Sequence, residues 1–230
     1  MRLLAWFPLM GLVCVLGAPA AASAAEADRL REAAAVVREL RTAPDRGIPE
    51  ELWADADCIV VIPSMKKAAF VFGGEYGRGM MSCRTNTGWS APLFMQLAKG
   101  SWGLQIGAEA VDLVMLVMNR RGVESLLDNK VSLGVDASVA AGPVGRTGRA
   151  TTDAALRAQI LSYSRSRGLF AGIDLSGGVL RPDTGANQDF YGRRVAAGDV
   201  LSGPMTTTDV GARDFTAALG TTGPAATTGR

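Results

Sequence analysis

The chain has 230 residues, of which 28 are Gly, and its 24 Lys and Arg nearly balance its 22 Asp and Glu, for a net charge of +2. So small an excess argues against bulk electrostatic binding of nucleic acid or anionic membranes and leaves local clusters of charge. The absence of His removes the usual zinc ligand, the usual general base near neutral pH and the His-dependent catalytic triads, which disfavours an enzyme.

The first 24 residues are predicted to be a secretory signal peptide. Arg2 precedes a short apolar run, and small residues follow as far as Ala24. The run is too short to span a bilayer, and Ala22 and Ala24 fit the small-residue pocket of a signal peptidase. We expect cleavage after Ala24 and a periplasmic or secreted protein. Lipid attachment at Cys14 is the less favoured alternative, because Cys14 lies inside the apolar run and no small residue precedes it.

Two helices are predicted at the start of the processed chain. Ala25–Thr42 has apolar residues at helical spacing and ends before Pro44, and Pro49–Ala54 begins with a Pro suited to a first helical turn. The first helix could pack on the domain or lie on a lipid surface. Its apolar face is mostly Ala and lacks large aromatic residues, which favours packing.

Strands follow, separated by glycines. Cys58–Ile62 is an apolar run stopped by Pro63, and Ala69–Phe72 leads into the glycine-rich segment Gly73–Gly79. Further strands are predicted at Trp102–Ile106, Val111–Met118, Val131–Val139 and Ala171–Val179, and further helices at Asn119–Leu127 and from Thr152 or Asp153. Glycines within strands mark bulges and strong coiling. The predicted fold is therefore α+β: an N-terminal helix, then a strongly curved, mainly antiparallel Gly-rich sheet or partial barrel with short helices.

One domain is expected over residues 25–200. Residues 201–230 are rich in Thr, Ala and Gly and are expected to be largely disordered, with a weak helical patch at Asp214–Leu219. Cys58 and Cys83 remain after processing, and an oxidising compartment would permit a disulfide between them. The alternative is two small buried apolar residues, and sequence alone leaves both open.

Catalytic motifs find no support. Ser64 and Lys67 match the Ser-x-x-Lys pattern of penicillin-recognising enzymes, but the partner motifs are absent, so a His-independent serine hydrolase is the least favoured function. Neither a phosphate-binding loop nor a nucleophile elbow is present. The carboxylates lack the close spacing of a metal site. We predict no catalytic residues, no metal and no cofactor.

Two basic clusters are candidates for binding an anionic head group, which needs convergent cationic and amide donors. Lys66 and Lys67 lie near the glycine-rich segment that contains Arg78, and Arg165 and Arg167 form a second pair with hydroxyl neighbours. Taken singly, each is also explained as a solvated or salt-bridged surface residue.

Five stretches of this sequence, in order and at the family's spacing, resemble the SYLF lipid-binding domain, also described as a yeast-type actin-binding domain. Together they lie within Arg29–Arg193, nearly all of the predicted domain: Pro63–Gly74, Gly88–Pro92, Gly107–Val114, Gly134–Gly145 and Ser162–Gly172. The resemblance implies binding of phospholipid head groups, in eukaryotic members phosphoinositides, through basic residues and an N-terminal amphipathic helix. Some eukaryotic members also bind and bundle actin, and the resemblance implies no catalytic residues.

The signal peptide changes what this resemblance implies. Bacterial-type members look like exported or envelope proteins, and this chain resembles them. An exported protein does not meet cytoplasmic actin, so we expect anionic phospholipids or a membrane surface as the partner. The alternative is a structural or assembly module that contacts other envelope proteins.

Overall fold

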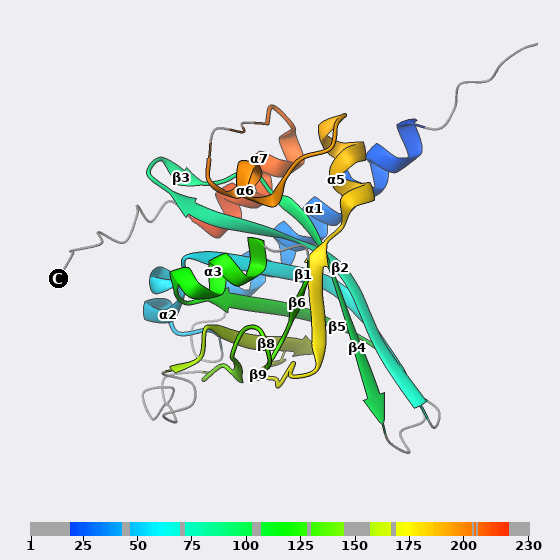
Figure 1. The fold of residues 1–230 in the computed structure, drawn as a ribbon, viewed down its shortest axis with the longest axis vertical. Helices are drawn as coiled ribbons and strands as arrows, with labels where there is room; N and C mark the ends of the chain where they lie inside the picture. Colours follow the sequence, from blue (N-terminus) through cyan, green and yellow to red (C-terminus); the bar gives the residue numbers. More distant parts are fainter. Residues whose placement is uncertain are drawn as a thin grey trace, which may run out of the picture.

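The computed structural model describes residues 19–42, 47–69, 72–102, 107–127, 130–144, 157–166, 169–203, 205 and 207–220. Its main helices are α1 (Pro19–Thr42), α2 (Glu50–Asp55), α3 (Arg120–Leu127), α5 (Thr184–Tyr191), α6 (Ala197–Leu201) and α7 (Val210–Leu219). Its strands are β1 (Cys58–Ala69), β2 (Phe72–Thr85), β3 (Gly88–Trp89), β4 (Leu93–Trp102), β5 (Gly107–Val117), β6 (Val131–Ser132), β7 (Val139–Ala141), β8 (Ile160–Ser166), β9 (Leu169–Gly172) and β10 (Gly178–Pro182). The predicted α+β class is confirmed (Figure 1).

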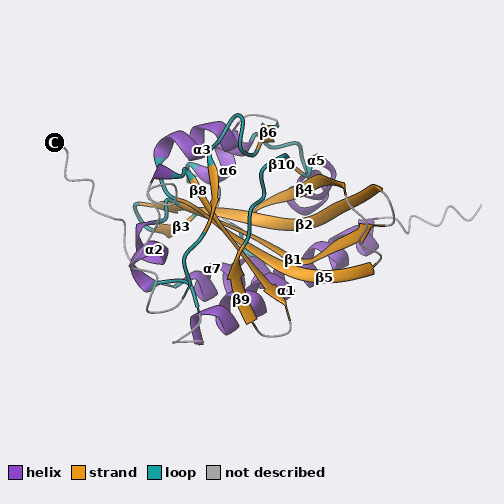
Figure 2. Cartoon of the chain, turned by 90° about the horizontal axis from the view of Figure 1, so that it is seen from below, coloured by secondary structure: helices purple, strands orange, loops and turns teal. Residues whose placement is uncertain are grey.

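The sheet curls so far that its two edges are nearly joined. Its order is β6-β10-β4-β2-β1-β5-β8-β7, with β3 beside β2 and β9 beside β8, and all of these pairs are antiparallel except β7 with β8. The edge strands β6 and β7 are consecutive in the chain, linked by residues 133–138 alone. So short a link can join the two edges only if the sheet closes at this end. In Figure 2 the strands of the strongly twisted sheet cross one another.

The predicted single strand Val131–Val139 is therefore wrong. The chain turns at Gly134–Asp136, where Gly134 has a φ of +87°, and the two halves pair at opposite edges of the sheet. The apolar residues alternate through the turn in the sequence, but their burial does not: Val131, Leu133 and Ala137 are buried, whereas Val135 in the turn is 82% exposed. Likewise Ala171–Val179 is divided between β9 and β10.

A bulge lets β1 continue through Pro63, where we expected it to stop. The pairing of β1 shifts register between Ile62 and Met65, and Ser64 takes a φ of +50° while its N–H donates to the Asp112 carboxylate at 2.8 Å. A proline is tolerated at a bulge because no ladder hydrogen bond is required there. The neighbouring strand approaches so closely that a Cβ on Gly79 would lie 1.9 Å from the Val61 carbonyl oxygen.

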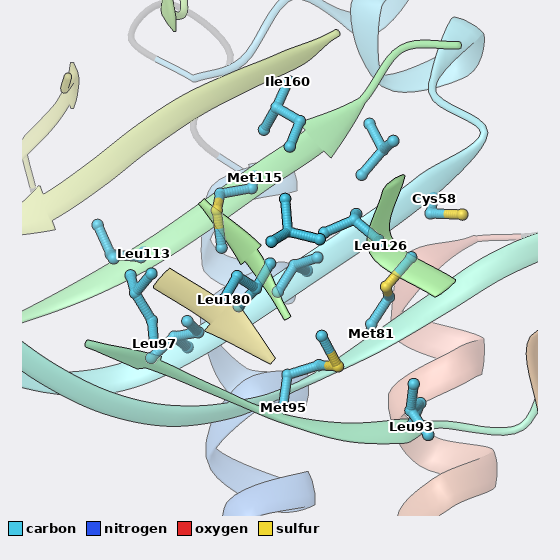
Figure 3. Packing of buried hydrophobic residues seen from close by; sticks show 14 of the residues in the cluster. Cys58, Met81, Leu93, Met95, Leu97, Leu113, Met115, Leu126, Ile160 and Leu180 are labelled. Atoms are coloured by element: carbon cyan, nitrogen blue, oxygen red, sulfur yellow. The ribbon is translucent and has the colours of Figure 1, made fainter. Parts of the chain in front are cut away.

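Each face of the sheet carries its own hydrophobic core. Inside the curl, residues of β1, β4 and β5 meet those of β6, β8 and β10; Figure 3 shows Leu97 and Leu180 near Leu113 and Met115. On the outer face, α1 and α7 pack against the sheet through a second cluster that contains Leu30. We call these sides the inner and outer faces.

The first helix packs on the domain, as predicted. Its fully buried residues on this side are Leu30, Ala33, Ala34 and Val37. Among the described side chains of α1, burial begins at Glu26, after the predicted cleavage site. Residues 1–18 lie outside the described residues, so the signal peptide stays a prediction.

The expectation of a largely disordered tail is wrong for Val210–Leu219, which form α7 against α1. Asp209 caps this helix by accepting from the Ala212 N–H at 2.8 Å, and Phe215 and Leu219 are fully buried. Side-chain donors also bind its C-terminal carbonyls: the Trp53 indole and the Arg41 guanidinium donate to the Leu219 carbonyl oxygen at 3.2 and 2.8 Å. The weak helical patch predicted at Asp214–Leu219 is the C-terminal part of this helix, and the Thr- and Gly-rich composition around it led us to expect disorder instead. Residues 221–230 lie outside the described residues.

Of the remaining helix predictions, two are confirmed and one is not tested. The helix after Pro49 and the helix after Asn119 are both present, and the Asn119 side chain accepts from the Gly122 N–H at 3.0 Å. The helix expected from Thr152 or Asp153 begins outside the described residues.

Replacing Phe215 by Ala should lower the free energy of unfolding by about 3–5 kcal/mol, because a large, fully buried aromatic side chain leaves a cavity. Urea titration followed by circular dichroism measures the loss. Val210→Ala is the control on the same helix; Val210 is 71% exposed, so the change should stay within about 0.5 kcal/mol. Equal stability of the Phe215 variant and the wild type would contradict the docking of α7.

Candidate functional site

The four predicted site cations that the structure describes lie on both faces of the sheet. Residues directly opposite each other on neighbouring strands project to the same face. Lys66 is opposite Tyr76, whereas Lys67 is opposite Glu75 and Glu109. Lys66, Arg78 and Arg165 thus lie on the outer face and Lys67 on the inner face, so the adjacent lysines do not form one site.

Lys67 belongs to a row of alternating charges across the inner face. The row runs Lys99, Glu75, Lys67, Glu109 over β4, β2, β1 and β5. Lys67 lies 3.7 Å from Glu75, Lys99 donates to the Asp174 carbonyl oxygen at 2.8 Å, and Ser166 donates to Glu109 at 2.7 Å. We call these four residues the charged row. The two positive and two negative charges of the row balance each other, so Lys67 is explained as a structural residue that pairs with its neighbours.

The outer face beyond α1 carries exposed cations around a tyrosine. Tyr76 is 43% exposed, and its hydroxyl accepts from the Arg78 Nε at 2.8 Å and lies 3.3 Å from the Gln96 side-chain oxygen. Arg181, on β10, is opposite Gln96 and shares this face. We call Lys66, Tyr76, Arg78, Gln96 and Arg181 the outer basic patch.

Two cations of this patch are available to a ligand. The side chains of Lys66 and Arg181 are exposed and form no hydrogen bond or ion pair within the part of the chain that the structure describes. The Arg78 side chain is half exposed, but its Nε also lies 3.5 Å from Asp183, and the hydrogen bond from Arg78 to Tyr76 raises the pKa of the guanidinium further. Sequence reasoning missed Arg181, because only strand pairing brings β10 beside β4.

Arg165 lies apart from the patch and is neutralised. Its guanidinium contacts Asp112 at 3.0 Å and also pairs with Glu39 of α1. These contacts tie β8 to β5 and to α1, so Arg165 has a structural role. Arg167, its predicted partner, lies outside the described residues.

Behind Arg78, a cluster of buried charges joins α1 to the start of α5. Arg29 lies 3.3 Å from Glu26 and 3.9 Å from Asp183, and it stacks 5.6 Å from the centre of the Phe94 ring. Glu26 and Asp183 are only 4% and 6% exposed, and each has one carboxylate oxygen without a hydrogen bond. Burial, aided by nearby Asp189 and Asp183, raises the pKa of Glu26 above its ordinary value despite Arg29.

Cys58 and Cys83 form a disulfide between directly opposite positions of β1 and β2. Both are buried, so the bond crosslinks the two central strands inside the core. Of the two possibilities that the sequence left open, the structure has the disulfide, and that bond suits the oxidising compartment expected for an exported protein.

Two other features, the Ser64–Lys67 pair and a cavity beside α7, do not have the geometry of a catalytic or head-group site. Ser64 and Lys67 lie on an extended strand, about 10 Å apart along the chain, rather than one helical turn apart as the acyl-enzyme pattern requires. A cavity of about 200 Å³ lies between the β2–β3 turn and α7, lined by residues such as Thr85, Trp89 and Arg213. Thr85 already donates to the Gly88 carbonyl oxygen, and the cavity is separate from the outer basic patch.

The described residues hold neither a metal-binding cluster nor a helix able to span a membrane. No group of three or more His, Cys, Asp or Glu in this part of the chain could hold a metal ion. In the same residues, no helix is both long and apolar enough to cross a membrane.

Comparisons with known proteins identify relatives of this chain. A family model described as Ysc84, "Las17-binding protein actin regulator", matches residues 98–222. The bovine (Bos taurus) "SH3 domain-containing YSC84-like protein 1" is 34% identical over 183 residues, covering 76% of this chain and 53% of the relative. The "LAS seventeen-binding protein 3" of Saccharomyces cerevisiae is 34% identical over 163 residues, covering 69% of this chain and 35% of the relative. The chain thus spans about half, or less, of the length of these relatives.

Reduction of the disulfide should lower the free energy of unfolding by roughly 3–4 kcal/mol, because the bond closes a loop between cysteines 25 positions apart. Urea titration with and without a reductant measures the difference. A Cys58→Ala/Cys83→Ala variant is the control and should not respond to reductant. Identical wild-type curves under the two conditions would contradict the bond.

Replacing Glu26 by Gln should change how stability depends on pH. A raised pKa in the folded state means that the folded protein holds this proton more tightly than the unfolded chain. The resulting stability is full below the ordinary pKa near 4.5 and is lost as pH rises through the raised value. Urea titrations from pH 4 to about 8 should show this loss in the wild type and less of it in Glu26→Gln. Parallel pH profiles for the two proteins would show that Glu26 keeps an ordinary pKa.

Proposed function

Because the chain belongs to the Ysc84 (SYLF) family, we propose that it is a non-enzymatic domain that binds the head groups of anionic phospholipids at a membrane surface. The single observation that carries this proposal is the outer basic patch, where Lys66 and Arg78 lie beside the exposed Tyr76 and Arg181 lies opposite Gln96 on the same face.

The geometry of this patch suits a phosphate group. Arg181 on β10 and Arg78 on β2 lie on either side of Gln96 on β4, so two strand spacings, or about 10 Å, separate their backbones. Two long guanidinium side chains can therefore converge on one anion held above Gln96, and Lys66 adds a third positive charge near Tyr76. The patch is local, which agrees with a chain that has almost no net charge.

The sheet, rather than the first helix, is the proposed contact. The family resemblance implies lipid binding through an N-terminal amphipathic helix, but the apolar face of α1 is covered by the domain core. The polar face of α1 pairs its charges with the domain, as Arg38 does with Asp214. These contacts leave the outer basic patch as the better-exposed cationic surface.

The proposed location is the periplasm or the outside of the cell, at an envelope membrane. The predicted signal peptide supports export, and the Cys58–Cys83 disulfide is compatible with it. The family model is described as an actin regulator, but an exported chain does not meet cytoplasmic actin. Actin is therefore left out of the proposal.

A second candidate is a protein-binding module of the envelope. The description of the family as Las17-binding favours it, because that partner is a protein rather than a lipid. Crosslinked envelope proteins that persist when lipid binding is abolished would support this candidate.

Replacing Lys66 and Arg181 by Ala should weaken binding to vesicles that contain phosphatidylglycerol by roughly tenfold to thirtyfold, since each exposed cation contributes about 1 kcal/mol near an anionic surface. Vesicle flotation of the processed protein, residues 25–230 verified by mass, measures the change at low salt. Arg78 is kept, because its loss would leave the buried Asp183 with one ion pair fewer.

A variant of two other exposed cations, Arg121→Ala/Lys130→Ala, has the same change in net charge and serves as the control. It should bind nearly as well as the wild type. Equal weakening by both double variants would assign binding to net charge and remove the patch from the proposal.

A further inference from the structure

The β1–β2 hairpin and the two strands that flank it project from the body of the molecule as a four-stranded extension. The order is β4-β2-β1-β5, so β4 and β5 pair with the hairpin and not with each other, and Figure 1 shows the ends of the strands reaching beyond the helices. The connecting residues 70–71 and 103–106 lie outside the described residues. We define the hairpin ends as the described strand residues next to these connections: 68–69, 72–74, 100–102 and 107–108.

A sharp boundary of charge separates the hairpin ends from the body. The charged row, Lys99 to Glu109, crosses all four strands at one level of the inner face. On the outer face, Tyr76 and Lys66 lie at nearly the same level. Beyond this boundary the sequence has no charged residue, either from 68 to 74 or from 100 to 108.

The hairpin ends are open on the outer face. Gly74 and Gly100 occupy paired positions there, and a Cβ built on either would meet no atom within 4 Å. Ala68 is opposite both Gly74 and Ala108, which completes a row of small residues. No described part of the chain packs against this row at the two glycines.

We propose that the hairpin ends enter the interfacial layer of a lipid bilayer, with the charged row and Lys66 remaining at its surface. This inference rests on the proposed function that the domain binds lipid, and it assigns the part of the chain that penetrates. Exposed tyrosines and the long stems of lysines are the side chains typical of membrane–water interfaces. Tyr76 and Lys66 stand at that position.

A bilayer fits this region better than a protein partner does. A protein would be recognised by one complementary face, whereas the described residues beyond the charged row carry no charge on either face of the four strands. The strand ends are also paired with one another, since Phe72 of β2 is opposite Trp102 of β4. The four uncharged strand ends would therefore enter one surface together.

The backbone sets the depth of entry. Pairing of β4 with β10 ends at Lys99, and pairing of β5 with β8 ends at Asp112. Beyond these points each strand has one open edge, whose N–H and C=O groups need water or head groups as partners. The three residue steps of strand from Lys99 to Trp102 span about 10 Å, a length that matches the interfacial layer.

Two kinds of variant test the insertion. Gly74→Asp/Gly100→Asp places charges in open space without clash, so the fold is retained, and it should lower binding to both phosphatidylcholine and phosphatidylglycerol vesicles about tenfold or more. Gly74→Asn/Gly100→Asn has nearly the same shape without the charge and should bind like the wild type. Brominated lipids should quench the tryptophan emission of the bound wild type, and much less that of Trp102→Phe.

The outcomes separate this inference from the proposed function. Binding without quenching, together with wild-type binding by the Asp variant, would overturn insertion and leave head-group binding intact. Loss of binding in the Asp variant but not in Lys66→Ala/Arg181→Ala would support insertion and remove the patch. A wild-type protein that binds neither kind of vesicle would contradict both.

Discussion

The near-closure of the sheet is the constraint on which the rest of the structure depends. Residues 133–138 alone join the two edge strands, so the sheet curls and encloses one hydrophobic core. The curl is possible because the bulge at Pro63 and Ser64 relaxes β1 at the centre and because Gly79 permits a close approach to Val61. The disulfide then fixes β1 to β2 at the closed end of the sheet.

Closure at one end leaves the other end open. Because β6, β8, β9 and β10 are short, only the four long strands β4, β2, β1 and β5 continue past the cores. Their charged row can be arranged across four strands because nothing apolar is required of the inner face there. The features relevant to a membrane, the outer basic patch and the uncharged hairpin ends, both belong to this extension, while α1 and α7 are committed to the core.

The candidate site was predicted only in part, for reasons that particular residues illustrate. Lys66 and Lys67 are neighbours in sequence, but strand geometry sends them to opposite faces, and Glu75 pairs with only one of them. Arg165 was a reasonable candidate by composition, yet Asp112 and Glu39 neutralise it from elements distant in the chain. Arg181 gave no local signal at all, because it joins the patch only through the pairing of β10 with β4.

Local sequence patterns predict the family, the α+β class, the first three helices and the buried strands at Cys58–Ile62 and Val111–Met118, because periodicity and helix caps are local properties of the chain. They missed β4 and β8, whose burial depends on the strands beside them. The sequence by itself also determined that any anion site must be a local cluster, since the net charge is so small. The tertiary structure alone decided that the Val131–Val139 alternation breaks into two edges, that α7 is ordered and which cations remain unpaired. These depend on contacts between residues far apart in the chain, which no local pattern records.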